Sequence, residues 1–210
     1  RSFVIGIKST VLQAKEKNFL KKYKPWGVIL FSRNIKSINQ TKKLTDNIRK
    51  IFKDQKYPIL IDQEGGRVNR LDKFISLDRL TSDYFGNLYV KNKKQFNITY
   101  KLFIDKTSHL LSSLGININT VPVLDLRHKG GSNVIGDRSY SKNPNIVSKI
   151  GDICIENFKK NSIGTVIKHI PGHGLAKVDS HLFTPTVDKT LNYLNKNDFK
   201  TFKSKKTLFA

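Results

Sequence analysis

Short, almost continuously apolar runs alternate along this chain with longer amphipathic stretches, and this alternation constrains the fold more than any other feature. The apolar runs are rich in Val and Ile and cover residues 2–7, 27–31, 58–62, 118–124 and 164–169. Runs of this length without a polar face are typical of parallel strands that are buried on both sides. Because such runs alternate with helical stretches, the sequence predicts an α/β fold built around a parallel sheet.

The stretches between the runs carry helical periodicity and helix-end signals. Apolar residues in the segment 44–52 follow the spacing of a helix with one apolar face, and a second helix is predicted over 102–114. Asn143 followed by Pro144 is typical of an N-cap with proline in the first turn of a third helix. Asn197 is expected to cap a last helix.

The polar residues that follow the apolar runs favour a barrel over an open, doubly wound sheet. A dinucleotide-binding sheet opens with a G-x-G-x-x-G turn, whereas K-S-T follows the first run at 8–10. Asp62, Asp125 and His169 stand at the ends of three runs, which is the position that carries the chemistry in TIM barrels. We therefore predict a single TIM (β/α)8-type barrel domain over residues 1–210.

Chain length qualifies this prediction. An eight-stranded barrel requires roughly 250 residues, and this chain has 210. Residues 207–210 resemble the start of another strand. The expected fold is therefore a C-terminally incomplete barrel, with the five apolar runs as strands and the start of a sixth.

Composition restricts the partners that such a domain can have. The net charge of +23 raises the question of a nucleic-acid partner, but the lysines are spread along the chain without a long basic block. We interpret this charge as a compositionally basic surface and expect no nucleic-acid partner. No apolar run approaches the roughly 20 residues of a membrane helix, so no membrane partner is expected. Cys154 is the single cysteine, which suits a reducing compartment and a place in the core.

Two motifs place charged side chains beside glycine turns. The first, D-Q-E-G-G-R-V-N-R, begins with Asp62 and closes with Arg70. Asp62 can accept hydrogen bonds from two adjacent sugar hydroxyls, and Arg70 can donate to an oxygen-rich ligand. An Asp–Arg pair that only stabilises the loop fits the spacing equally well. The second motif, G-D-R-S-Y, contains Arg138, which either reaches a ligand or pairs with Asp137.

A third motif concentrates histidines within one loop. K-H-I-P-G-H-G begins with Lys168 and His169, and D-S-H follows with Asp179 and His181. A loop rich in Gly and Pro suits a movable segment over a site. A turn would bring the Asp179 carboxylate onto one ring nitrogen of His181 and leave the other nitrogen for proton transfer. Two alternatives stay open: a polar loop with structural histidines, or a metal site with His169, His173, Asp179 and His181 as ligands.

Taken in this order, D-Q-E-G-G-R-V-x-R, G-D-R-S-Y, K-H-x-P-G-H-G and D-S-H resemble glycoside hydrolase family 3, and most closely its bacterial β-N-acetylhexosaminidase branch. K-H at a strand end is shared widely in the family, whereas P-G-H-G followed by D-S-H is specific to the branch. The resemblance implies no cofactor and no metal. It implies that a terminal N-acetylglucosamine is contacted by Asp62, Arg70, Arg138, Lys168 and His169.

The resemblance also implies a retaining mechanism. His181 would be the general acid/base, Asp179 would orient and activate it, and a nucleophilic aspartate would attack the anomeric carbon. In the family that aspartate follows a later strand. Asp198, the last acid here, stands in a helix-start context. We therefore expect the nucleophile to lie outside residues 1–210 and this segment alone to be inactive.

The activity implied is removal of terminal N-acetylglucosamine from peptidoglycan-derived fragments during cell-wall recycling. The expected enzyme is a cytoplasmic monomer that acts on a small oligosaccharide or muropeptide. A catalytically inactive sugar-binding relative and a metal-dependent barrel hydrolase remain the alternatives.

Overall fold

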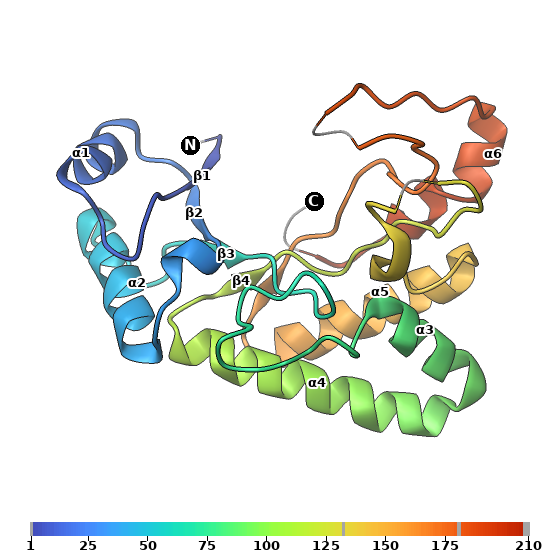
Figure 1. Ribbon diagram of the computed structural model, residues 1–210, viewed down its shortest axis with the longest axis horizontal. Helices are drawn as coiled ribbons and strands as arrows, with labels where there is room; N and C mark the ends of the chain where they lie inside the picture. The colour runs from blue at the N-terminus through green and yellow to red at the C-terminus, as the bar shows by residue number, and fades with distance from the viewer. Residues whose placement is uncertain (1, 132, 180–181, 208–210) are drawn as a thin grey trace.

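Five parallel strands form one sheet at the centre of the computed structural model, which describes residues 2–131, 133–179 and 182–207 (Figure 1). Each strand pairs with the next in sequence, with Val28 opposite Ile59 and Ile118 opposite Gly164. The α/β prediction is therefore confirmed. The strands are β1 (Val4–Gly6), β2 (Gly27–Leu30), β3 (Ile59–Ile61), β4 (Ile118–Asn119) and β5 (Gly164–Thr165).

The order of the strands, β1-β2-β3-β4-β5, favours a barrel over a doubly wound sheet. Right-handed crossovers between consecutive neighbours bring every connecting helix to the same face of a sheet, as in a barrel. A doubly wound sheet instead reverses its strand order to receive helices on both faces. In the described part of the chain the sheet is open, with β1 and β5 at its edges, so barrel closure is not observed.

Burial follows the position of each strand in the sheet. All three residues of β3 are buried, because neighbours cover both of its edges. In β1, by contrast, Val4 is 39% exposed. The prediction of burial on both faces is therefore wrong for the run 2–7. Beyond β5, the Thr207 hydroxyl donates to the Thr165 carbonyl at 2.8 Å. The rest of the predicted sixth strand, 208–210, lies outside the described residues.

Helices surround the sheet from the left, below and right in Figure 1. The predicted helices at 44–52 and 102–114 are confirmed within α2 and α4. They belong to a set comprising α1 (Ala14–Tyr23), α2 (Ile38–Phe52), α3 (Ser82–Lys91), α4 (Lys93–Ser113), α5 (Pro144–Lys160) and α6 (Leu191–Lys196), with 3-10 turns η1 (Ser32–Asn34), η2 (Gly136–Arg138) and η3 (Phe199–Phe202).

Capping residues account for where several helices begin. The Asn143 side chain accepts a hydrogen bond from the Asn145 backbone, and Pro144 occupies the first turn of α5, as predicted. The prediction for Asn197 is wrong. Thr190 starts the last α-helix by accepting from the Tyr193 backbone, and Asn197 ends that helix. A 3-10 turn with Asp198 at its start then follows.

The core lies between the sheet and the helices α4 and α5. Tyr100, Tyr140 and Cys154 are fully or almost fully buried there, and the two tyrosine hydroxyls lie 2.6 Å apart. Burial raises the pKa of the Cys154 thiol to about 12. Cys154 is thus the inert core residue that the sequence predicted.

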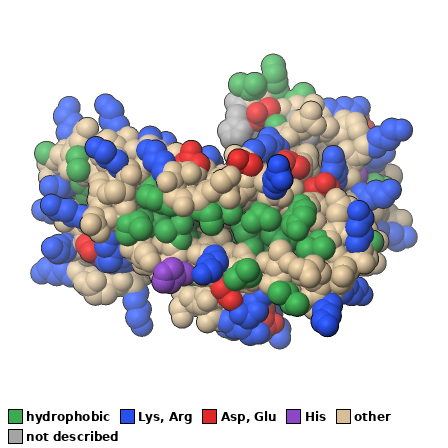
Figure 2. Space-filling model, turned by 60° about the horizontal axis from the view of Figure 1, so that its bottom comes forward, with side chains coloured by type: hydrophobic (Ala, Val, Ile, Leu, Met, Phe, Trp, Pro, Cys, Tyr) green, Lys and Arg blue, Asp and Glu red, His purple; other side chains and the backbone are tan. Residues whose placement is uncertain are grey.

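Lys and Arg side chains are dispersed over the face of the molecule that Figure 2 shows. On the face in Figure 2, Lys and Arg side chains lie around the periphery and a hydrophobic band crosses the middle. No single basic patch dominates this face, which agrees with a compositionally basic surface. Within the described residues, no helix is both long enough and apolar enough to cross a membrane.

Candidate active site

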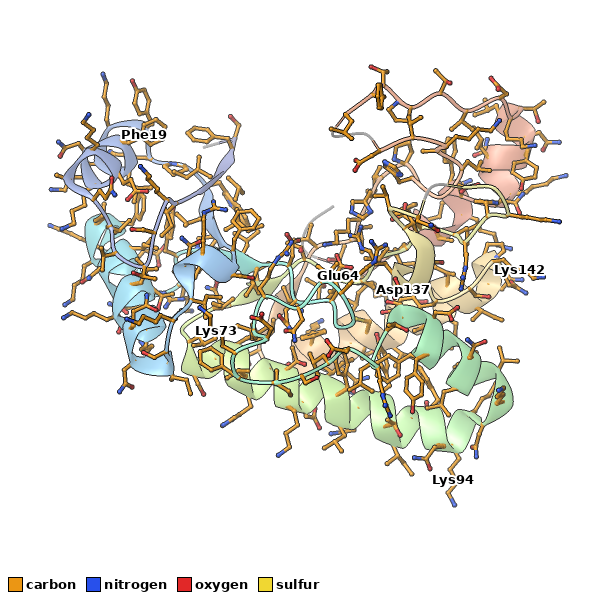
Figure 3. All side chains as sticks on the ribbon, in the orientation of Figure 1. Phe19, Glu64, Lys73, Lys94, Asp137 and Lys142 are labelled. Atoms are coloured by element: carbon orange, nitrogen blue, oxygen red, sulfur yellow. The ribbon has the colours of Figure 1, made fainter. Side chains whose placement is uncertain are left out.

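The polar side chains that the sequence singled out converge where β3, β4 and β5 end. Asp62 directly follows β3, and Lys168 and His169 follow β5. Arg138 ends η2 and reaches the same place. Glu64 and Asp137 lie close together at the centre of the molecule in Figure 3. The carboxyl ends of parallel strands share one edge of a sheet, which is why residues far apart in sequence meet here.

Asp62 is held by hydroxyl and ammonium groups. Its Oδ1 atom lies 2.9 Å from Lys168 Nζ and also accepts from the Thr120 hydroxyl, while Oδ2 lies 3.7 Å from an Arg70 guanidinium nitrogen. Burial alone would raise the pKa of Asp62, but the Lys168 charge and the Thr120 hydrogen bond hold it below its ordinary value. The carboxylate is therefore ionised at neutral pH and able to accept further hydrogen bonds.

Glu64 joins two of the predicted ligand-contacting cations. Arg138 donates to both carboxylate oxygens of Glu64 at 2.8 Å, and Lys168 Nζ lies 2.5 Å from Oε1. The Glu64 side chain is only 3% exposed. Burial would raise its pKa, yet the Arg138 hydrogen bonds and the Lys168 charge lower it. One buried anion therefore fixes the positions of both cations, and with them the directions in which their remaining N–H groups point.

This arrangement excludes one of the two interpretations of Arg138 that the sequence allowed. The sequence left open a pairing with neighbouring Asp137, but Arg138 forms its paired hydrogen bonds with Glu64 instead. Asp137 accepts from Arg67 Nε at 3.0 Å. The same Arg67 donates to three backbone carbonyls of residues 133–135. Arg67 thus fixes the segment that leads into Arg138.

His169 is oriented from both sides of its ring. Its Nδ1 atom lies 2.5 Å from Asp125 Oδ2, and its Nε2 atom lies 3.3 Å from an Arg138 nitrogen. An arginine can only donate, so Nε2 accepts a hydrogen bond from Arg138 and Nδ1 donates one to Asp125. Asp125 also accepts from the backbone of His169 and of His173, the latter at 2.6 Å. One buried carboxylate therefore positions the start of the histidine-rich loop.

The predicted acid/base pair is described only in part. Asp179 lies in the loop, and its carbonyl accepts from the backbone of Leu182 and Phe183 at 3.0 and 2.9 Å. Ser180 and His181 lie outside the described residues. The contact between Asp179 and His181 therefore stays a prediction.

Three further residues of the cluster were not assigned a role from the sequence. Glu64 stands inside the first motif and Asp125 directly follows an apolar run, so a signal existed for both. Thr120 carried no such signal, because a threonine near a strand end is common. Among the described residues, no three His, Cys, Asp or Glu side chains form a group that could hold a metal ion.

The cluster is suited to an oxygen-rich, polyhydroxylated ligand. Asp62 supplies an ionised acceptor, Arg70, Arg138 and Lys168 supply charged donors, and His169 has a fixed ring orientation. Such a set can bind several hydroxyl groups at once, because the side chains of Asp62, Arg138, Lys168 and His169 are already held in place by their hydrogen bonds.

Residues 6–205 match the Glycosyl hydrolase family 3 N terminal domain. A fold with parallel strands in barrel order and a polar cluster at their carboxyl ends agrees with that match. The chain belongs to glycoside hydrolase family 3, as the motifs indicated.

Similar proteins indicate which branch of the family the chain resembles. The chain is 35% identical over 180 residues to a beta-hexosaminidase of Hydrogenovibrio crunogenus, a match covering 85% of this chain and 49% of that protein. It is 33% identical over 199 residues to beta-hexosaminidase A of Pseudoalteromonas piscicida, covering 92% of this chain and 32% of that protein. The chain thus spans half or less of these two relatives.

A solved structure shows the same arrangement. NagZ from Neisseria gonorrhoeae superposes with a TM-score of 0.86 and 31% identity, over 95% of this chain and 58% of that one. That enzyme has also been solved in complex with N-trifluoroacetyl-D-glucosamine with the same similarity to this chain. The resemblance to the bacterial β-N-acetylhexosaminidase branch is therefore confirmed.

Proposed function

We propose that the complete protein carrying this chain is an exo-acting, retaining β-N-acetylglucosaminidase. The observation that carries the proposal is the convergence of Asp62, Arg70, Arg138, Lys168 and His169 at the carboxyl ends of the strands. These side chains hold the terminal N-acetylglucosamine. Family membership and the beta-hexosaminidase relatives support the same substrate class.

Catalysis in this proposal uses a histidine as the general acid/base. His181 protonates the glycosidic oxygen while the bond from that oxygen to the anomeric carbon breaks and a carboxylate forms a bond to the same carbon. Water then attacks the glycosyl-enzyme, gives its proton back to His181 and releases the sugar with retained configuration. An unperturbed imidazole pKa of about 6.5 suits both roles near neutral pH. Asp179 orients the ring, and we assign the nucleophilic aspartate to a residue outside 1–210.

The natural substrate in this proposal is a peptidoglycan-derived oligosaccharide or muropeptide, cleaved during cell-wall recycling by a monomer in the cytoplasm. The charged donors of the cluster, Arg70, Arg138 and Lys168, favour this class, since such fragments are acidic and rich in hydroxyl groups.

The experiment that tests the activity uses the complete protein with 4-nitrophenyl β-N-acetylglucosaminide. We expect release of nitrophenol, with kcat/KM lowered about 100-fold or more in His181→Ala, because general acid–base catalysis contributes that much. His109→Ala on the exposed face of α4 is the matched control and should leave the rate unchanged. A complete protein that binds N-acetylglucosamine without cleaving the glycoside would instead be a sugar-binding relative.

A further inference from the structure

After His169 the chain runs away from the sheet, and Asp198, at the start of η3, lies against the segment that follows β4, where a buried pair closes the base of this excursion. The loop segment, defined here as residues 172–179 and 182–198, lies at the upper right of Figure 1, from orange to red. At its base, His128 Nε2 lies 2.9 Å from Asp198 Oδ1. The two side chains are 14% and 2% exposed. Because His128 follows β4, the pair joins two parts of the chain that are 70 residues apart.

The outgoing limb of the loop segment packs against both partners. A Cβ atom at Gly172 would lie 3.0 Å from Asp198 Cβ, and one at Gly174 would lie 3.2 Å from His128 Cδ2 and 2.0 Å from the Leu126 carbonyl. The glycines thus allow the backbone to run directly against both residues. The limb is therefore in direct contact with the pair.

Asp198 is itself fixed to the body of the domain. Its carbonyl accepts from the Thr201 hydroxyl at 2.8 Å, and Phe202 at the end of η3 packs against the core. The return limb is anchored at this point, so the pair ties both ends of the loop segment to one place. Closing a loop at its base removes conformations in which the two ends separate.

We propose that His128 and Asp198 are positioning residues for proton transfer in this enzyme. The inference rests on the proposed function, since it concerns the loop whose sequence contains Asp179 and His181. Neither partner belongs to the five proposed sugar contacts. Loss of the pair loosens the base of the loop and misplaces the acid, while the sugar contacts at the strand ends stay in place.

The test exploits the chemistry of the leaving group. A 2,4-dinitrophenolate leaves without protonation, whereas an alkoxide requires the acid. In the complete protein, we expect His128→Ala to lower kcat/KM roughly 10-fold for methyl β-N-acetylglucosaminide and less than about 3-fold for the dinitrophenyl glycoside, because only the former needs a correctly placed acid. Inhibition by free N-acetylglucosamine should not change, because its contacts lie outside the loop segment.

Matched variants separate positioning from loss of folding. His128→Gln keeps an N–H donor near the Nε2 position and should restore most of the methyl glycoside rate. Asp198→Asn keeps the volume of the side chain, weakens the pair, and should show the same leaving-group dependence even if His128→Ala does not fold. His109→Leu, which changes an exposed histidine on α4, should behave as wild type.

The outcomes distinguish the two proposals. A wild-type protein that cleaves neither glycoside contradicts the proposed function. An active wild type whose folded His128 and Asp198 variants lose both rates equally, or lose neither, overturns the positioning role alone.

Discussion

Glu64 connects the physical chemistry of the candidate site to the stability of the domain. It is a buried anion whose two partners, Arg138 and Lys168, are both proposed to contact sugar. Removing one member of a buried ion pair leaves an uncompensated charge, which costs more than the pair contributes. The same residue therefore affects both folding and ligand binding.

For Glu64→Gln we expect the free energy of unfolding at pH 7 to fall by about 3 kcal/mol, because two buried cations lose their shared anion. Inhibition by N-acetylglucosamine should weaken at the same time. Urea unfolding of the complete protein measures the first effect. Asp137→Asn is the control: its carboxylate is 42% exposed, and loss of such a pair costs less than about 1 kcal/mol. An equal loss in both variants would contradict the role of Glu64.

The difference in stability between wild type and Glu64→Gln depends on pH, because the pKa of Glu64 is lowered in the folded protein. A carboxylate whose folded pKa is depressed stabilises the fold above its unfolded pKa of about 4.3, and this contribution is lost as the pH falls through the folded value. The difference in the free energy of unfolding between wild type and Glu64→Gln should therefore become smaller as the pH falls below about 4. A difference that stays constant would show that Glu64 does not titrate with the fold.

Some of these contacts could be predicted from sequence and others could not. Asp62, Lys168 and His169 were placed correctly, because the carboxyl ends of parallel strands share one edge. The partner of Arg138 was not predictable, since Glu64 is 74 residues away while Asp137 is adjacent. The 3-10 turn η2 decides between them. It gives neighbouring side chains different directions, so Arg138 reaches inward and Asp137 meets the exposed Arg67.

At the scale of the elements, the position of Arg138 depends on the segment 133–138, which leads into and includes η2. Arg67 fixes this segment through its hydrogen bonds. Arg67→Ala should release three backbone carbonyls and loosen the segment, since one guanidinium holds them all. We expect weaker inhibition by N-acetylglucosamine with a stability change below about 1 kcal/mol, because Arg67 is half exposed. Hydrogen exchange of amides 134–138 provides the direct measurement. Unchanged exchange together with weaker inhibition would show that Arg67 acts in another way.

The close contact between α3 and the segment after η2 leaves no space for a side chain at Gly86. A Cβ atom at Gly86 would lie 1.7 Å from the Tyr140 carbonyl, and backbone atoms cannot turn aside as a side chain does. Gly86→Ala should destabilise the domain by about 3 kcal/mol, the upper end of the usual cost of overpacking. Thermal unfolding is the measurement, and Val90→Ala, an exposed change on the same helix, is the control. A stable Gly86→Ala variant would mean that α3 can shift without cost.

Elements with a buried apolar stripe were predictable, and those without one were not. The helix α2 buries Leu44 and Ile48 and was found from its periodicity. In α1 only Leu20 is buried, and α6 buries no residue, so neither carries the periodic signal. The strands came out shorter than the apolar runs. Residues 121–124 are buried, but most of them form no strand pairing, because Pro122 has no backbone N–H to donate to the neighbouring strand.

At the scale of the whole molecule, the sheet is open in the described residues, and its first strand is partly exposed. Phe3 and Val4 are 40% and 39% exposed beside the unpaired edge of β1. Exposed, apolar strand edges favour pairing between molecules. The barrel order of the strands makes closure by further strands the natural way to cover this edge.

Residues 1–210 expressed alone should therefore self-associate with rising concentration and show no hydrolysis of an aryl β-N-acetylglucosaminide. Light scattering measures the first property and nitrophenol release the second, with the complete protein as the control for both. A monodisperse, active segment would contradict the assignment of the nucleophile to a residue outside 1–210.

The consecutive strand order has a consequence for synthesis on the ribosome. Each strand pairs with the strand made immediately before it, so every new strand meets a partner that has already emerged. A chain that emerges at about 5–20 residues per second can then extend its sheet one unit at a time, without waiting for its C-terminal part. The growing edge of the sheet then moves with the nascent chain.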